Sequence, residues 1–311
     1  MIRFYQHNEI DSIKWNGCIE RSSFPTVFAD YDLLSLVSPG WCALIEGDYE
    51  AVMPLPTRRK WGVSYVFTPF FISRLGLFAA TVPTAEMMAE FIEALPRQYR
   101  QCDLCLNPNN DVSLLASDSY QMMVSHGLAL NFSYEALKAN FSENTHRNLK
   151  TAAKYNLSLT TADIRQIVDL FVNNRGQQKG VGFKRADYEM IIRMVDFWKQ
   201  RNLVDLVGVK DETGRLIAGA CFLKDHQRRW FLFSGRDNAE SDKRAMFYLI
   251  DEYIKNHAGE ELTLDFNGSM NPNVARFYAG FGAQRYEFPV LAYTPNSFWS
   301  PLIRWYRRWR S

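Results

Sequence analysis

Residues 264–282 have the sequence LDFNGSMNPNVARFYAGFG, and this stretch decides the fold. Apolar side chains alternate over residues 262–266, which predicts a β-strand. The Asn267-Gly268 pair predicts a turn after it. Pro272 then begins a helix that extends to Phe281, because proline is favoured in a first helical turn.

The segments upstream of this stretch predict a three-stranded meander over residues 203–210, 216–224 and 229–234. The turn Asp211-Glu-Thr-Gly214 between the first two strands is a strong hairpin signal. A helix is predicted from residue 134 to about residue 155, followed by a short strand at 159–161. The remaining predictions for this half are helices at 163–174, 185–201 and 241–257 and a last strand at 286–293.

The first half of the chain also predicts alternating helices and strands. Helices are expected at 11–21 and 84–100, and Thr84 is a plausible N-cap. Prolines at 54 and 56 predict a loop over residues 54–61, because proline cannot donate to a strand ladder. Strands are expected at 41–46, 50–55, 63–68, 75–79, 101–106 and 120–132.

The composition is that of a globular protein, with 47% hydrophobic and 23% charged residues among 311. This length suits two domains, expected at 1–133 and 134–296, with a tail at 297–311. Lys and Arg number 36 against 34 Asp and Glu, so charge gives no indication of a nucleic-acid partner, and no DNA is expected. The 14% aromatic share suggests that some rings line a cleft or an interface.

Cysteine usage and the N-terminus predict a cytoplasmic protein without a metal. Cys102 and Cys105 form a CxxC, but no second CxxC or His pair completes a zinc site. The five cysteines are therefore expected to be reduced thiols. The N-terminus lacks a signal-peptide pattern, and no apolar run approaches the ~20 residues that span a bilayer.

The element order of the second half resembles the GNAT acyltransferase fold, and two such units in tandem resemble its FemAB-like branch. Residues 273–282 look like the late helix of that family, with Tyr278 four residues before Gly282. Residues 146–154 resemble the basic helix that opens the second unit, and Pro54-Leu-Pro, Pro69-Phe and Leu75-Gly76 resemble the first unit. The resemblance implies an α/β (α+β) fold with two tandem GNAT-like domains, each a mixed, mostly antiparallel sheet flanked by helices.

The resemblance also implies residue roles. Tyr278 would protonate the leaving group, and Asp265, beside Asn267, would hold or deprotonate the incoming amine. The alternatives are an aromatic ring packed against Phe281 and a carboxylate that caps the turn. Ser234, Gly235 and Arg236 end a strand in the expected cleft and could receive a phosphate.

The acyl donor is open between acyl-CoA, such as acetyl-CoA, and aminoacyl-tRNA. The Gly-rich pyrophosphate loop of GNAT enzymes is missing from residues 234–246, which favours tRNA. Tyr278 replaces the Lys of FemAB-like peptidoglycan enzymes, which favours CoA.

Two basic clusters are candidate binding groups. Arg147, Lys150 and Lys154 are spaced three and four apart and therefore follow one helical stripe, either as an anion clamp or as a solvated face. The second cluster, predicted to bind an anionic substrate, consists of Arg58, Arg59 and Lys60, with Trp61 available for stacking.

The tail carries four arginines and an aromatic face. Arg304, Arg307, Arg308 and Arg310 flank Leu302, Trp305, Tyr306 and Trp309 on a predicted helix. Residues 298–311 suit either an anionic membrane interface, at the inner face of the membrane, or docking on the protein itself.

The sequence therefore predicts an N-acyltransferase that acts on the amine of a small-molecule or lipid-linked acceptor, such as a peptidoglycan precursor. The alternative is a non-catalytic GNAT-like protein that binds an anionic ligand or a membrane surface.

Overall fold

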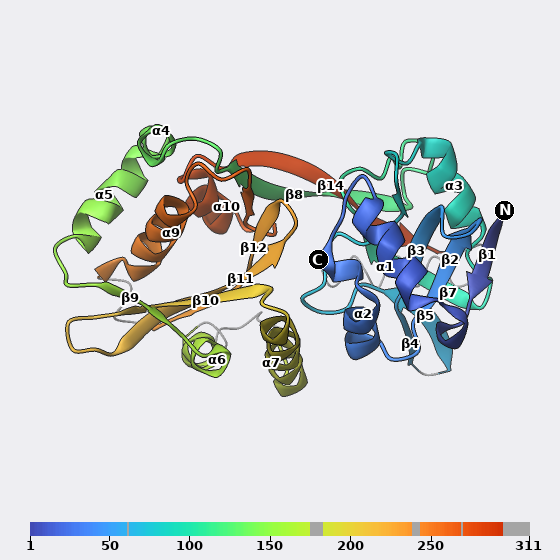
Figure 1. Ribbon diagram of the computed structural model, residues 1–311, viewed down its shortest axis with the longest axis horizontal. Coiled ribbons are helices and arrows are strands. Elements are labelled where there is room, and N and C mark those ends of the chain that lie inside the picture. Colours follow the sequence, from blue (N-terminus) through green and yellow to red (C-terminus); the bar gives the residue numbers. More distant parts are fainter. Residues whose placement is uncertain (61, 175–182, 238–242, 269, 295–311) are drawn as a thin grey trace. The chain divides into compact units, whose positions relative to one another are not determined.

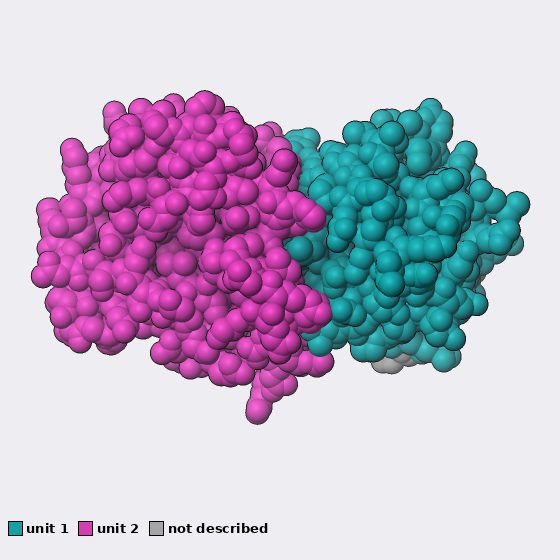
Figure 2. All heavy atoms as spheres, in the orientation of Figure 1, with its two compact units in different colours: residues 1–123, 287–311 teal, residues 124–286 magenta. Residues whose placement is uncertain are grey.

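The structure is a computed structural model that describes residues 1–60, 62–174, 183–237, 243–268 and 270–294. Contacts divide the chain into unit 1, residues 1–123 and 287–311, and unit 2, residues 124–286 (Figure 2). This division differs from the two consecutive domains expected from the sequence, which were bounded at residues 133 and 296. The reason is that β14 (Gln284–Tyr293) leaves unit 2 and pairs antiparallel with β7 (Tyr99–Cys105) of unit 1.

Unit 1 contains two groups of paired strands. One has the order β1-β2-β3-β6, and the other joins β4, β5, β7 and β14 in that order. Helix α1 (Ser12–Arg21) packs on β3 and β6, and its N-terminus is capped by Asp11, which accepts hydrogen bonds from the backbone N–H groups of residues 13 and 14. The other elements are β1 (Ile2–Tyr5), η1 (His7–Glu9), η2 (Val27–Ala29), α2 (Tyr31–Val37), β2 (Cys42–Glu46), β3 (Ala51–Leu55), β4 (Thr57–Lys60), β5 (Val63–Phe67), β6 (Phe78–Ala79) and α3 (Ala85–Glu93).

Two predictions for unit 1 were wrong. The stretch expected as a loop contains β4, which pairs antiparallel with β5. Pro56 lacks an N–H group, but its carbonyl still accepts a hydrogen bond from Phe67 N at 3.0 Å, so the ladder continues past it. The helix expected to reach residue 100 ends at Glu93, because Pro96 disfavours helical geometry in the residue before it.

Unit 2 is built on strands in the order β8-β13-β12-β11-β10-β9. Helices α4, α5, α9 and α10 lie on one side of this sheet, and α6 and α7 lie on the other (Figure 1). The strands β10, β11 and β12 form the expected antiparallel meander. The bounds are β8 (Tyr120–Ala129), α4 (Tyr134–Ala139), α5 (Glu143–Ala152), β9 (Ser158–Thr161), α6 (Ile164–Asn173), α7 (Arg185–Gln200), β10 (Val204–Lys210), β11 (Leu216–Asp225), β12 (Arg228–Arg236), α9 (Ala245–Asn256), β13 (Thr263–Asp265) and α10 (Pro272–Ala279).

The long helix expected from residue 134 is two helices. Ser142 begins the second by accepting a hydrogen bond from Thr145 N, and its own N–H donates to Gly280 O at 2.9 Å. Serine favours such caps because its hydroxyl competes for backbone groups. A Cβ at Gly280 would lie 2.6 Å from the Thr145 hydroxyl, so glycine allows α10 to end against α5.

Apart from these corrections, the main helix and strand predictions are confirmed with shifts of a few residues at their ends. The expected α/β (α+β) fold class, with mixed, mostly antiparallel sheets flanked by helices, is confirmed as well. Within the described residues, no helix is both long enough and apolar enough to cross a membrane.

Candidate functional site

A pocket of about 330 Å³ lies in unit 2 between β12, α9 and α10. Its volume falls within the roughly 300–1,000 Å³ typical of small-molecule sites. It lies beside a divergence of strands, because β12 and β13 run parallel but pair only at residues 228–230 of β12. We call it the Tyr278 pocket. Its lining residues are Phe231, Ser234, Arg236, Met246, Phe247, Asn273, Val274, Phe277 and Tyr278.

Tyr278 lines this pocket and is only 8% exposed. Its ring stacks on Phe266, with centroids 4.4 Å apart and planes 19° from parallel, and it forms an edge-to-face pair with Phe231, with centroids 6.1 Å apart. This packing fixes the orientation of the ring, so the residue has the support that a proton donor needs. Packing and a chemical role are therefore compatible at this position.

Asp265 lies at the end of β13 and is fully buried. Its Oδ1 accepts hydrogen bonds from Ser125 Oγ at 3.0 Å and from Asn267 N at 2.9 Å. Its Oδ2 accepts from Tyr286 Oη at 2.5 Å and pairs with Arg228 Nη1 at 3.3 Å. Four protein donors thus occupy the carboxylate, which makes Asp265 an anchor for three strands and for Asn267, whose φ of 55° is left-handed.

Ser234, Gly235 and Arg236 divide between the two faces of β12. Ser234 and Arg236 line the Tyr278 pocket. Gly235 lies against α6, where an added Cβ would come within 2.1 Å of Ile167 O and 2.7 Å of Phe171 N. The alternation of a strand explains this division, and it gives Gly235 a packing role.

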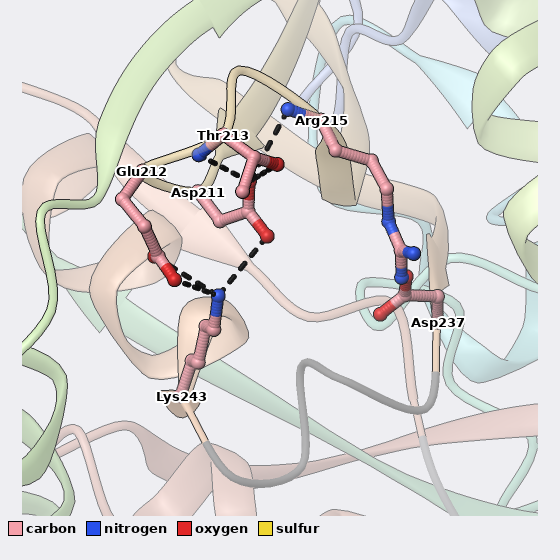
Figure 3. Close-up of polar contacts among 6 residues, drawn as sticks. All are labelled: Asp211, Glu212, Thr213, Arg215, Asp237 and Lys243. Carbon is pink, nitrogen blue, oxygen red and sulfur yellow. Dashed lines mark hydrogen bonds and ion pairs between the residues drawn. The ribbon is translucent and has the colours of Figure 1, made fainter.

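A polar cluster holds both sides of the connection from β12 to α9 (Figure 3). Lys243 Nζ donates to Glu212 at 2.8 Å and to Asp211 Oδ2 at 3.0 Å in the β10–β11 turn. Arg215 pairs with Asp237 at the end of β12. Hydrogen bonds from Thr213 and from Lys243 hold the pKa of Asp211 well below its ordinary value. The predicted hairpin thus fastens the start of α9, whose residues Met246 and Phe247 line the Tyr278 pocket.

The first basic cluster is not gathered at this pocket. Arg147, Lys150 and Lys154 are exposed, and Lys154 lies beyond the end of α5 at Ala152. Lys150 lines a different pocket, between α5 and α9, which shares no lining residue with the Tyr278 pocket.

The second basic cluster belongs to unit 1. Arg58, Arg59 and Lys60 are exposed residues of β4, and the Arg58 guanidinium lies 4.5 Å from the centre of the Phe67 ring. Trp61 and the tail at 298–311 fall outside the described residues.

Sequence reasoning missed His126 on β8. It is 5% exposed, its ring centre lies 6.2 Å from that of Tyr278, and its Nδ1 has no hydrogen-bond partner among the described residues. Burial and the nearby Arg285 lower its pKa, although Asp265 opposes them, which favours a neutral imidazole. A single histidine within a strand carries no spacing signal, so only the fold could reveal this neighbour.

Cysteines and metal-binding groups add nothing to this site. None of the five cysteines forms a disulfide in the described structure, and four of them are buried. Burial raises the pKa of Cys18 to about 11. The described residues contain no group of three or more His, Cys, Asp or Glu that could hold a metal ion.

Comparison with known proteins identifies the second half of the chain. Residues 139–286 match the family model described as "Acetyltransferase (GNAT) domain". Among curated proteins, none matches the chain significantly.

Solved structures share the fold along nearly the whole chain. A structure of FemX matches with a TM-score of 0.65 and 12% identity, covering 97% of this chain and 99% of that one. A tandem GNAT protein from the clavulanic acid biosynthesis pathway matches with a TM-score of 0.53 and 13% identity, covering 96% and 100%. The L-PGS structure from Bacillus licheniformis matches with a TM-score of 0.51 and 13% identity, covering 96% of each chain. Residues 139–286 are therefore similar to GNAT acetyltransferase domains, and the chain as a whole shares the fold of FemX and of the tandem GNAT protein.

Proposed function

We propose that this protein transfers an acyl or aminoacyl group from a thioester or ester donor to the amine of a cell-envelope component. The observation that carries the proposal is the Tyr278 pocket, in which a firmly packed phenol lies within the GNAT domain together with Ser234 and Arg236. The cell-envelope acceptor rests on the FemAB-like resemblance and on the fold shared with FemX and with L-PGS.

The reaction begins with attack of a neutral amine nitrogen on the donor carbonyl, which forms the new C–N bond. The tetrahedral intermediate then collapses, and the C–S bond of a thioester or the C–O bond of an ester breaks. Tyr278 donates its phenolic proton to the departing thiolate or alkoxide, and the proton lost by the attacking nitrogen goes to solvent. A positioned acid or base of this kind accelerates a reaction by about 10²–10⁴-fold.

The walls of the Tyr278 pocket suit a donor that carries negative charge. Arg236 supplies a guanidinium, and the first turn of α9 brings the positive end of a helix dipole to the same pocket. Beyond Trp230, β13 no longer pairs with β12, so the edge of β12 there can lie along a donor chain. These features fit the phosphates and the arm of CoA as well as the end of a tRNA.

The first experiment measures the melting temperature with and without millimolar acetyl-CoA. A ligand at 100 times its dissociation constant stabilises a protein by about 2.7 kcal/mol, and an Arg236→Ala variant should show a smaller shift. A saturable shift would identify CoA as the donor. Without a shift, transfer from charged tRNA is assayed next, and failure of both donors to acylate any of a panel of amines would contradict the proposal.

The second experiment compares turnover of Tyr278→Phe with that of Tyr188→Phe, a matched control on α7. Loss of the acid should lower kcat by about 10²-fold or more, whereas the control should keep the activity of the unmodified protein. Full turnover by Tyr278→Phe would remove the acid role and leave the transferase assignment to the donor experiment.

A further inference from the structure

Unit 2 contains a second pocket, of about 360 Å³, which is lined by other residues of α9. It lies among α4, α5 and α9 and the segment after α5, and we call it the Asp251 pocket. It shares no lining residue with the Tyr278 pocket, so the proposed acyl transfer does not use it. Its volume is also within the range of small-molecule sites.

Asp251 is the most unusual group in its wall. The residue is 7% exposed, and its Oδ1 accepts a hydrogen bond from Tyr134 Oη at 2.8 Å. No donor to Oδ2 is found in the described part of the chain, nor does any described cation come within 4 Å of this carboxylate. Burial is the main reason that the pKa of Asp251 is raised. In a residue that is largely removed from water, a carboxylate oxygen without a protein donor is open to pairing with a ligand cation.

Among the acidic residues of this wall, Asp251 is the one that can pair with a ligand cation. Glu252 also lines the pocket, but it is paired with Lys255 at 3.5 Å. Lys138 lies over the Tyr134 ring at 5.1 Å. Lys150 lines the pocket, is exposed and forms no ion pair with any described residue. Among the described residues of this wall, Asp251 has no ion-pair partner within 4 Å, although the charges of Lys138 and Lys255 act on it. Lys138 and Lys150 are the lining lysines without an ion pair to any described residue, and Lys150 is the more exposed of the two, on a long flexible stem.

The rest of the wall is largely apolar. Leu149, Ala152 and Leu157 line the pocket beside the aromatic ring of Tyr248. Such a surface recognises a hydrocarbon side chain through burial, and aromatic faces tolerate a nearby ammonium.

We infer that the Asp251 pocket binds a free amino acid with an apolar side chain. The ammonium group of the amino acid donates a hydrogen bond to Oδ2 of Asp251, and the carboxylate of the amino acid pairs with Lys150. The hydrocarbon side chain lies on Leu149, Ala152 and Leu157. Three features of one ligand thereby match three features of the wall.

The test is isothermal titration calorimetry of the full chain with millimolar L-alanine, L-valine, L-leucine, L-methionine and L-phenylalanine. We expect saturable binding of at least one of them. The tightest binder is then compared with its N-acetyl derivative, which lacks the ammonium, and with its amide, which lacks the carboxylate. Each should bind about 10- to 100-fold more weakly, as expected for loss of a charged hydrogen bond.

Variants locate the binding. Asp251→Asn keeps the acceptor for Tyr134 and should weaken binding by about 10- to 100-fold, and Lys150→Met should also weaken it. Lys154→Met, an exposed control that lines neither pocket, should bind as the unmodified protein does. Absence of binding by all five amino acids would overturn the inference, as would equal binding of the derivatives or unchanged binding by Asp251→Asn. None of these outcomes bears on acyl transfer, whose tests use the Tyr278 pocket.

Discussion

Two of the buried aspartates of unit 2, Asp265 and Asp251, have surroundings that differ sharply. At the strand junction, Asp265 is fully buried and accepts four protein donors, including Arg228. In the pocket between α5 and α9, Asp251 is almost as buried but accepts one donor, from Tyr134. A carboxylate whose oxygens are all occupied holds the fold together, whereas one with an unused oxygen is available to a ligand. Burial alone therefore does not indicate which acid is functional.

Removal of the occupied carboxylate should have the largest effect. Asp265→Ala removes the carboxylate that pairs with the partly buried Arg228 and accepts from three further donors, so we expect a loss of about 3–5 kcal/mol in the free energy of unfolding. Urea denaturation at neutral pH measures it. An unchanged unfolding free energy together with abolished transfer would instead support the amine-orienting role of Asp265.

Gly235 tests the packing of β12, the strand that carries Arg228, against α6. In Gly235→Ala the new methyl group meets the Ile167 carbonyl and the Phe171 amide of α6, which are backbone atoms that cannot move aside cheaply. We expect a loss of about 1–3 kcal/mol. Gly17→Ala is the control, since in α1 the added methyl meets only the end of the Arg21 side chain. Equal stability of the two variants would contradict the tight contact between β12 and α6.

Asp251→Asn should behave differently from Asp265→Ala. The amide keeps an acceptor for Tyr134 and removes a buried charge, so stability at neutral pH should be unchanged or raised within about 1 kcal/mol. The folded-state pKa of Asp251 is raised above 3.8, so the unmodified protein loses stability as pH rises through that folded pKa. Any advantage of the variant should therefore be present at neutral pH and vanish near pH 3.8 in parallel urea titrations. A large loss in the free energy of unfolding at neutral pH would show that the carboxylate of Asp251 stabilises the fold.

The smallest effect is expected at His126. Its folded-state pKa is lowered below 6.5, so the unfolded chain binds a proton at a pH where the folded chain resists it. The stability of the unmodified protein should therefore fall as pH decreases below 6.5, and His126→Asn should lack this part of the slope. Urea denaturation from about pH 8 to about pH 5 measures the difference. Identical slopes would indicate an imidazole that is protonated as easily in the folded state.

Local rules in the sequence account for most of the fold. Thr84 caps α3 as expected and accepts from Met87 N, because a cap depends on residues three positions apart. The hairpin at 211–214 forms as predicted, with Gly214 at a φ of 80°. Pro272 begins α10 for the same local reason. Two of the failures, the β4 strand and the break before Ser142, occur where a distant partner takes over a backbone group. The third, the end of α3 at Glu93, follows from a local rule about Pro96.

The candidate site was less predictable. The sequence selected Tyr278, Ser234 and Arg236, and the fold brings these three to one pocket. It gave no indication that Lys150 lies in another pocket, because a helical stripe says which residues share a face but not what that face meets.

What the sequence by itself determined is the order of helices and strands, their caps and turns, and the resemblance carried by residues 264–282. What only the tertiary structure decided is which charged groups already have hydrogen-bond and ion-pair partners within the protein. The hydrogen bond from Ser125 to Asp265 joins residues 140 positions apart. Periodicity and capping act over a few residues, whereas the partners of a buried charge come from whichever strands and helices the fold places around it.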